Sequence, residues 1–295
     1  MKRRAFLLAT GTTIVALPQL PRAARASSPA ARLDALASDL PGVLGVSCRT
    51  LADQPPILRY NDRVSFPTAS TIKVLILATA FAHEERYPGT LDMSITTYRR
   101  NLIGGSDFMS NAPDGARFRV RDLLVPMIRV SDNTASNALI GFFGVNAINA
   151  IGKAAGMTHT HLARKFLDYT AIVHHQDNRT TPADMAQLLF LIARGAREGI
   201  STIVSPQHCR RMIDIMLGQT DRDAIPAALP PNTQVANKTG EIDGTRNDVA
   251  IVEPFAESPY VLAVYTEDVT DYAAAYRAIH RVAALAHSLI GSSGL

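Results

Sequence analysis

Strand-like segments gather near the two ends of this sequence, and the long stretch between them has mainly helical periodicity. The early segments are "GVLGVSCRTL" (42–51) and "PPILRYN" (55–61), and the late ones are "TQVANKTG" (233–240), "DVAIVEP" (248–254) and "YVLAVYTE" (260–267). Because an isolated pair of strands is marginal in water, we predict one sheet built from both ends of the chain. Strands joined mostly by short turns are predicted to run antiparallel.

The predicted fold class is therefore α+β, with two lobes made by one chain. An α/β lobe is predicted from residues 27–62 and 206–295, and an all-helical lobe from residues 63–205. Helical patterns at 28–40 and 271–290 are predicted to flank the sheet. At 295 residues with 47% hydrophobic content, the chain has enough apolar material for a full core.

The first 26 residues have the pattern of an export signal. They combine a basic start, an apolar stretch too short to span a bilayer and a small-residue "ARA" ending at Ala26. The pair Arg3-Arg4 resembles a twin-arginine signal, although an ordinary secretory signal fits as well. We expect a periplasmic or secreted protein without a stable membrane anchor after cleavage.

Loss of this leader changes the charge of the mature chain. The leader holds five basic and no acidic residues, so its removal lowers the formal charge from +4 to −1. The basicity that would suggest nucleic acid or an anionic membrane as a partner lies in the leader, so neither is predicted to bind the folded body.

Cysteine and histidine patterns do not indicate a metal site. Cys48 and Cys209 are too far apart in sequence for metal-ligand spacing, and a disulfide between them is allowed but not indicated. The "HTH" at 159–161 and "HH" at 174–175 lack a supporting carboxylate pattern. We expect neither metal nor organic cofactor.

Three short motifs occur in an order that chance does not explain. Ser70 and Lys73 stand three residues apart in "FPTASTIKV", at the head of an apolar run, and are neighbours on one helix face. "SDN" follows at 131–133 and "KTG" at 238–240. A lone SxxK pair is weak evidence, but all three motifs together are specific.

These motifs and their surroundings resemble the class A β-lactamases and penicillin-binding proteins over essentially the whole mature chain. "VSDNTASNALI" and "TTPADMAQLL" look like the family's contexts as well. The resemblance implies a five-stranded antiparallel sheet flanked by helices beside a helical lobe. It also implies acyl transfer through a serine.

The resemblance makes Ser70 the nucleophile and Lys73 its base. A hydroxyl needs a base at neutral pH, and an amine serves only when it is uncharged. Burial, a helix N-terminus and a second cation would lower the pKa of Lys73, and Lys238 is the expected second cation. By the same resemblance, Ser131 passes a proton to the leaving nitrogen.

The remaining motif residues are expected to bind substrate. Asn133 can donate to and accept from a side-chain amide, while Lys238 and Thr239 resemble the pair that holds a carboxylate. Gly240 would let a substrate lie along the strand edge.

The resemblance also covers the oxyanion hole and one arginine. The backbone N–H groups of Ser70 and Glu241 are expected to form the oxyanion hole. Arg246 matches a family arginine that reaches the carboxylate, although the connection from "KTG" is shorter here.

One family residue is missing. Class A enzymes activate the hydrolytic water with an Ω-loop glutamate, and the matching "LARKFLDYTAI" contains none. Counting back from Pro182 puts Lys165 at that position. Asp168, the nearest carboxylate, is either the hydrolytic base or only a structural tie of the loop. Arg164 begins the loop, and its usual aspartate partner appears as Asn178, so the ion pair is absent or relocated.

Three functions stay open from the sequence. The first is a class A-type serine β-lactamase that opens the ring through a Ser70 acyl-enzyme, and the second is a D-alanyl-D-alanine peptidase or esterase on the same scaffold. The third is a β-lactam-binding protein that deacylates slowly. A monomer that acts on a small-molecule or peptide substrate is expected.

Overall fold

The computed structural model describes residues 28–52, 54–200 and 203–292. The predicted leader, residues 1–26, lies outside the described residues. The helices are α1 (Pro29–Ser38), α2 (Lys73–Arg86), α3 (Val120–Arg129), α4 (Asn133–Phe143), α5 (Val145–Ala154), α6 (Tyr169–Val173), α7 (Pro182–Glu198), α8 (Pro206–Leu217) and α9 (Tyr272–Ser292). The strands are β1 (Val43–Thr50), β2 (Leu58–Tyr60), β3 (Phe66–Pro67), β4 (Ser94–Thr96), β5 (Arg117–Arg119), β6 (Arg179–Thr180), β7 (Val235–Ile242), β8 (Thr245–Val252) and β9 (Tyr260–Glu267).

One five-stranded sheet contains strands from both ends of the chain, which confirms the predicted α+β fold. Its order is β2-β1-β9-β8-β7, and each neighbouring pair is antiparallel. The early strand β1 pairs along its full length with the late strand β9. The strand that carries "KTG", β7, therefore lies at one edge of the sheet.

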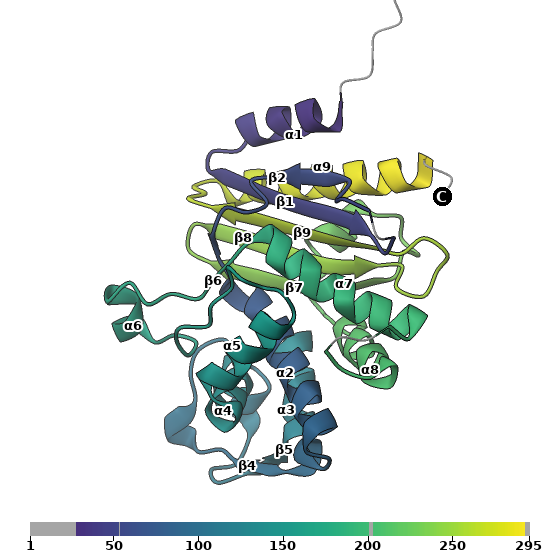
Figure 1. The fold of residues 1–295 in the computed structure, drawn as a ribbon. Helices are drawn as coiled ribbons and strands as arrows, with labels where there is room; N and C mark the ends of the chain where they lie inside the picture. Colours follow the sequence, from purple (N-terminus) through teal and green to yellow (C-terminus); the bar gives the residue numbers. More distant parts are fainter. Residues whose placement is uncertain (1–27, 53, 201–202, 293–295) are drawn as a thin grey trace, which may run out of the picture.

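Helices cover both faces of the sheet (Figure 1). On one face, α1 and α9 pack over a cluster that includes Leu33, Val46 and Leu262. On the other face, α7 crosses β1 and β9, and the apolar core continues from there into the helical lobe. The predicted lobe boundary at 205/206 stays a prediction, since α7 contacts both the sheet and α8.

Helix α2 forms the centre of the helical lobe. Its residues from Lys73 to Phe81 are all buried, so it is apolar on every side, as a fully enclosed helix requires. It contacts α3, α4 and α5, and a short hairpin of β4 and β5 closes the far end of the lobe (Figure 1). The turn before α2 contacts the edge strand β7, so the start of this buried helix lies at the sheet edge.

The two cysteines are free thiols in separate parts of the core. Cys48 lies on β1 in the cluster under α1 and α9, whereas Cys209 lies on α8 in the larger cluster. Burial raises the pKa of the Cys48 thiol. Within the described ranges, no single helix is long and apolar enough to cross a membrane, although α4 and α5 reach that size as a pair bent by 86°.

Candidate active site

Ser70 lies in a short 3-10 turn, η1 (Ala69–Ile72), that leads directly into α2. The preceding residue, Ala69, has a left-handed backbone with φ 44°. Strain of this kind costs stability and is commonly kept where function needs a fixed geometry. Ser70 is half-buried and borders a cavity of about 530 Å³ between the end of β7 and the Ω-loop, residues 164–178.

Lys73 is fully buried one turn after Ser70. Its Nζ lies 2.6 Å from the Ser131 carbonyl oxygen, 3.0 Å from Ser131 Oγ and 2.8 Å from Asn133 Oδ1. The expected hydrogen bond to the Ser70 hydroxyl is absent from the described chain, because the amine is turned toward these three acceptors. The Lys73 amine therefore hydrogen-bonds to Ser131 and Asn133 of the "SDN" motif.

Burial lowers the pKa of both motif lysines. Burial lowers the pKa of Lys73 well below its ordinary value, the charge of Lys238 lowers it further, and the Asp132 carboxylate opposes both. Burial also lowers the pKa of Lys238 to about 8, against the opposing charge of Asp248. Burial and the charge of Lys238 thus favour the uncharged form of Lys73 that a base requires, while a pKa of about 8 leaves Lys238 mostly an ammonium at neutral pH.

The "SDN" motif is held by its middle residue, a role that the sequence analysis did not assign. Asp132 caps α4 by accepting from the Ala135 N–H at 2.8 Å, and it accepts from the Met109 N–H at 2.9 Å. An aspartate just before a helical pattern is the sequence signal for such a cap. Ser131 before it has a left-handed backbone with φ 57°, which directs its hydroxyl to Lys73.

Asn133 uses both ends of its amide inside the protein. Its Oδ1 accepts from Lys73, and its Nδ2 donates to the Gly104 carbonyl oxygen at 2.9 Å. A side chain on Gly105 would collide with this amide, since its Cβ would lie 2.7 Å from Asn133 Nδ2. The side chain borders the Ser70 cavity, so a substrate amide would share or displace these partners.

The "KTG" motif brings the free edge of β7 against the Ser70 turn. A Cβ on Gly240 would lie 3.0 Å from the Ser70 nitrogen and 3.0 Å from the Thr68 carbonyl oxygen. Glycine is therefore required for the strand to pass so close to the serine. Lys238 is fully buried and Thr239 nearly so, and the Lys238 Nζ donates to the Thr239 carbonyl oxygen at 2.8 Å.

Glu241 borders the Ser70 cavity, but the structure does not bring Arg246 there. The Arg246 guanidinium stacks on the Tyr272 ring at 3.7 Å and donates to the Ile242 carbonyl oxygen at 3.0 Å. It also lies 3.7 Å from Glu241 Oε1, and Tyr276 donates to the same carboxylate. These contacts hold the arginine at the β7–β8 hairpin, so its role toward a substrate carboxylate stays a prediction.

Phe166 is the Ω-loop side chain that faces the lysine. The Lys73 Nζ lies 4.4 Å from the centroid of its ring, and the ring borders the same cavity as Ser70. Asn137 fixes the loop here, because its amide donates to the Phe166 carbonyl oxygen and accepts from the Phe166 N–H. The sequence contained no signal for this apolar contact.

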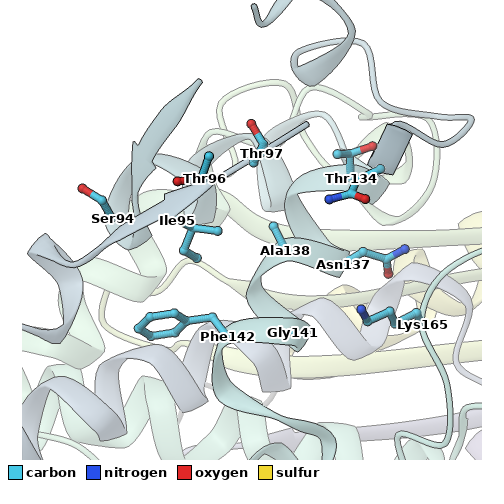
Figure 2. Close-up of a pocket in the computed structure, with 11 residues that line it drawn as sticks. Ser94, Ile95, Thr96, Thr97, Thr134, Asn137, Ala138, Gly141, Phe142 and Lys165 are labelled. Atoms are coloured by element: carbon cyan, nitrogen blue, oxygen red, sulfur yellow. The ribbon is translucent and has the colours of Figure 1, made fainter. Parts of the chain in front are cut away.

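Lys165 points away from the nucleophile, which corrects the position counted back from Pro182. Its side chain borders a separate cavity of about 480 Å³. Figure 2 shows the Lys165 amine in this cavity, alongside Gly141 on α4. Phe166, the next residue, borders the Ser70 cavity instead, and we take it to occupy the place of the family glutamate. Successive side chains in an extended segment point to opposite sides. Lys165 and Phe166 therefore border two different cavities.

The Ω-loop is closed by an ion pair that has moved by one residue. Arg164 donates from Nη2 and Nε to Asp177 Oδ1 at 2.7 Å and 3.1 Å. Asn178 ties the loop without charge, since its Oδ1 accepts from the backbone N–H groups of Ala163 and Arg164. Of the two alternatives open from the sequence, the pair is relocated and not lost.

Asp168 is occupied at the start of the short helix α6. Its Oδ1 accepts from the Ala171 N–H at 3.1 Å as the N-cap, and the residue is not part of the wall around the Ser70 cavity. This geometry favours the structural alternative over the hydrolytic base. Across the described residues, no three or more His, Cys, Asp or Glu side chains are grouped to hold a metal ion.

Comparison with known proteins agrees with the fold and these motifs. The model of the β-lactamase enzyme family matches residues 28–290, and the chain belongs to this family. β-lactamase L2 of Stenotrophomonas maltophilia is 30% identical over an alignment of 315 residues that covers 99% of this chain and 100% of L2. β-lactamase CTX-M-25 of Escherichia coli is 29% identical over 266 residues, 89% of each chain.

Solved structures have the same fold. A structure of L2 complexed with relebactam has a TM-score of 0.77 and 28% identity, and it covers 90% of this chain and 97% of its own. PBP-A has a TM-score of 0.79 at 24% identity, with 90% and 96% covered, a likeness that shows the fold alone.

Proposed function

We propose that this protein opens β-lactam rings through a covalent Ser70 acyl-enzyme, as a serine hydrolase of the class A β-lactamase type. The observation that carries the proposal is the buried Lys73 amine, whose pKa is lowered beside Ser131 and Lys238. In its neutral form Lys73 has a lone pair that can take the Ser70 proton directly or through Ser131. Relatives named as β-lactamases, at 29% and 30% identity, support the same reaction.

Each proposed step uses Ser70 or a residue of the "SDN" motif or of strand β7. Attack by the Ser70 oxygen on the lactam carbonyl gives a tetrahedral oxyanion, for which backbone N–H groups at Ser70 and Glu241 are the proposed donors. Ser131 then returns a proton to the leaving nitrogen, and Lys238 attracts the substrate carboxylate. Loss of one oxyanion donor typically costs about 10²- to 10³-fold in rate.

A chromogenic cephalosporin assay combined with intact-mass measurement tests this proposal. Turnover together with a transient mass increment is the expected result. Hydrolysis of a D-Ala-D-Ala peptide or a simple ester, with neither β-lactam turnover nor a β-lactam adduct, would point to a peptidase or esterase instead.

A specific observation favours slow release of the acyl group. Phe166 replaces the expected glutamate and covers Lys73, and a phenyl ring cannot take a proton from water. The acyl-enzyme is then expected to accumulate, and the protein would act as a slowly deacylating β-lactam-binding protein. A mass increment that persists for minutes after free drug is removed would support this second candidate.

The change Asp168→Asn is expected to leave the deacylation rate within about twofold of the parent. Asparagine caps helices about as well as aspartate, so α6 should stay in place. Acyl-enzyme decay, followed by intact mass after removal of free benzylpenicillin, measures the rate. A decrease of tenfold or more would restore Asp168 as the hydrolytic base.

Acylation by carboxylate-bearing β-lactams is expected to fall as pH rises through about 8. Burial sets the pKa of Lys238 there, so the ammonium that attracts the carboxylate is present below this pH and lost above it. The measurement is the second-order acylation rate by benzylpenicillin between pH 6.5 and 9.5.

Lys238→Arg is the matched variant for this profile. A guanidinium stays charged beyond pH 12, so the decrease near pH 8 should disappear. An identical decrease in parent and variant would show that another group causes it.

We also propose that the chain is exported by its N-terminal leader. The support is the sequence pattern alone, with Arg3-Arg4 before the apolar stretch and Ala26 at a small-residue cleavage site. The mass of protein from a periplasmic fraction should match a chain that begins at Ser27. Full-length protein confined to the cytoplasm would contradict export.

A further inference from the structure

Strand β1 places two polar side chains on the sheet face that α7 covers. Side chains alternate along a strand, and Val46 and Cys48 face the core under α1 and α9, so Ser47 and Arg49 face α7. Ser47 is 1% exposed, and its Oγ has no hydrogen-bond partner in the described part of the chain. Buried hydroxyls without a partner are rare, and an absent ligand is one physical explanation.

This hydroxyl borders a cavity of about 400 Å³ between β1, the end of β2 and the first turn of α7. Three arginines border the same cavity: Arg49, Arg59 and Arg63. Ser47 stands opposite Arg59 in the β1–β2 pair, so their side chains leave the sheet on the same face. Arg49 is positioned by Gln187 on α7, whose Oε1 accepts from Nη1 at 2.9 Å.

The two carboxylates that border the cavity are already engaged by protein groups. Asp62 accepts from Arg59 Nε at 2.8 Å. Asp184 accepts from the His159 N–H at 2.7 Å and from Thr160 Oγ1 at 2.8 Å. Since Arg59 is paired with Asp62, the cavity keeps one excess positive charge, from Arg49 and Arg63 against Asp184.

We propose that this cavity binds a small organic anion that carries phosphate or carboxylate groups. A guanidinium group can donate two parallel hydrogen bonds to the oxygen pair of a phosphate or a carboxylate. The Ser47 hydroxyl would donate one more hydrogen bond from the sheet side of the cavity. The volume lies within the range of small-molecule sites. The cavity shares no bordering residue with the Ser70 cavity, so the proposal does not depend on the acylation chemistry.

Thermal unfolding with two probes tests the site and distinguishes the two anion chemistries. Inorganic phosphate and citrate are titrated separately at constant ionic strength, because general screening changes stability as well. The melting temperature should rise with the logarithm of the probe concentration above the dissociation constant, by roughly 5 °C at about a hundred times that constant. The probe with the lower dissociation constant identifies a phosphate or a polycarboxylate as the ligand class.

Three variants make the outcome specific. Arg63→Gln, an exposed change at the rim, should weaken the effective probe about tenfold, and Ser47→Ala should weaken it without lowering the melting temperature of the anion-free protein. Arg117→Gln removes an exposed arginine on β5, far from the cavity, and should bind like the parent. No rise in the melting temperature with either probe at constant ionic strength, or equal affinity in Arg63→Gln and Arg117→Gln, would overturn the proposal.

Discussion

Replacing Phe166 by glutamate is expected to speed deacylation by about 10²- to 10⁴-fold, the usual contribution of a positioned general base. The Phe166 ring borders the Ser70 cavity and lies 4.4 Å from the Lys73 amine. A carboxylate in its place would reach the space where water must approach the acyl carbon. It would also attract a proton to Lys73, so acylation should become slower while release becomes faster.

The matched control is Phe166→Gln, which opens the same space and supplies no base. Acyl-enzyme decay by intact mass and steady-state turnover of a chromogenic cephalosporin give the two rates separately. Equal deacylation in Phe166→Glu and Phe166→Gln would mean that the ring acts only by excluding water. A parent that already turns over as fast as Phe166→Glu would refute the slow-release candidate.

Replacing Lys73 by arginine is expected to lower the acylation rate by about 10²- to 10⁴-fold. Lys73 is fully buried, and its pKa is lowered by that burial and by Lys238, so its amine can be neutral. A guanidinium stays protonated in proteins and cannot accept the Ser70 proton. The second-order rate of benzylpenicillin labelling measures the loss.

Two further variants separate catalysis from folding in this test. Lys73→Met removes the amine but keeps an apolar chain of similar length, and it should lose acylation to the same extent. Lys165→Arg changes a lysine whose amine lies in the other cavity, and it should acylate at the parent rate. Acylation by Lys73→Arg within about threefold of the parent would exclude the amine as the base.

The sheet could be predicted because its strands and helices have distinct periodicities. Five strand-like segments at the two chain ends required one shared sheet, and β1 does pair with β9 along its length. The neighbourhood of Ser70 and Lys73 could also be predicted, since residues three apart in one helical turn stay close whatever surrounds them. Local helix geometry and the periodicity of the strands thus account for the predictions of the fold that the structure confirms.

The contacts that decide the chemistry of release were not predictable in the same way. Whether Phe166 or Lys165 faces Lys73 depends on how the Ω-loop is held by Asn137, a residue 29 positions earlier in the sequence. Asn178 has no charge, so the loop-closing pair is formed by Asp177, and Asn178 accepts from backbone N–H groups instead. Contacts between residues far apart in the chain leave no periodic pattern in the sequence from which they could be predicted.

The most direct test of the central claim is the site of covalent labelling by benzylpenicillin. Peptide mapping by mass spectrometry should place one penicilloyl group on Ser70 in the parent and none in Ser70→Ala, at equal thermal stability. A label that persists in Ser70→Ala, or a folded parent that is never labelled, would contradict the proposed acyl-enzyme.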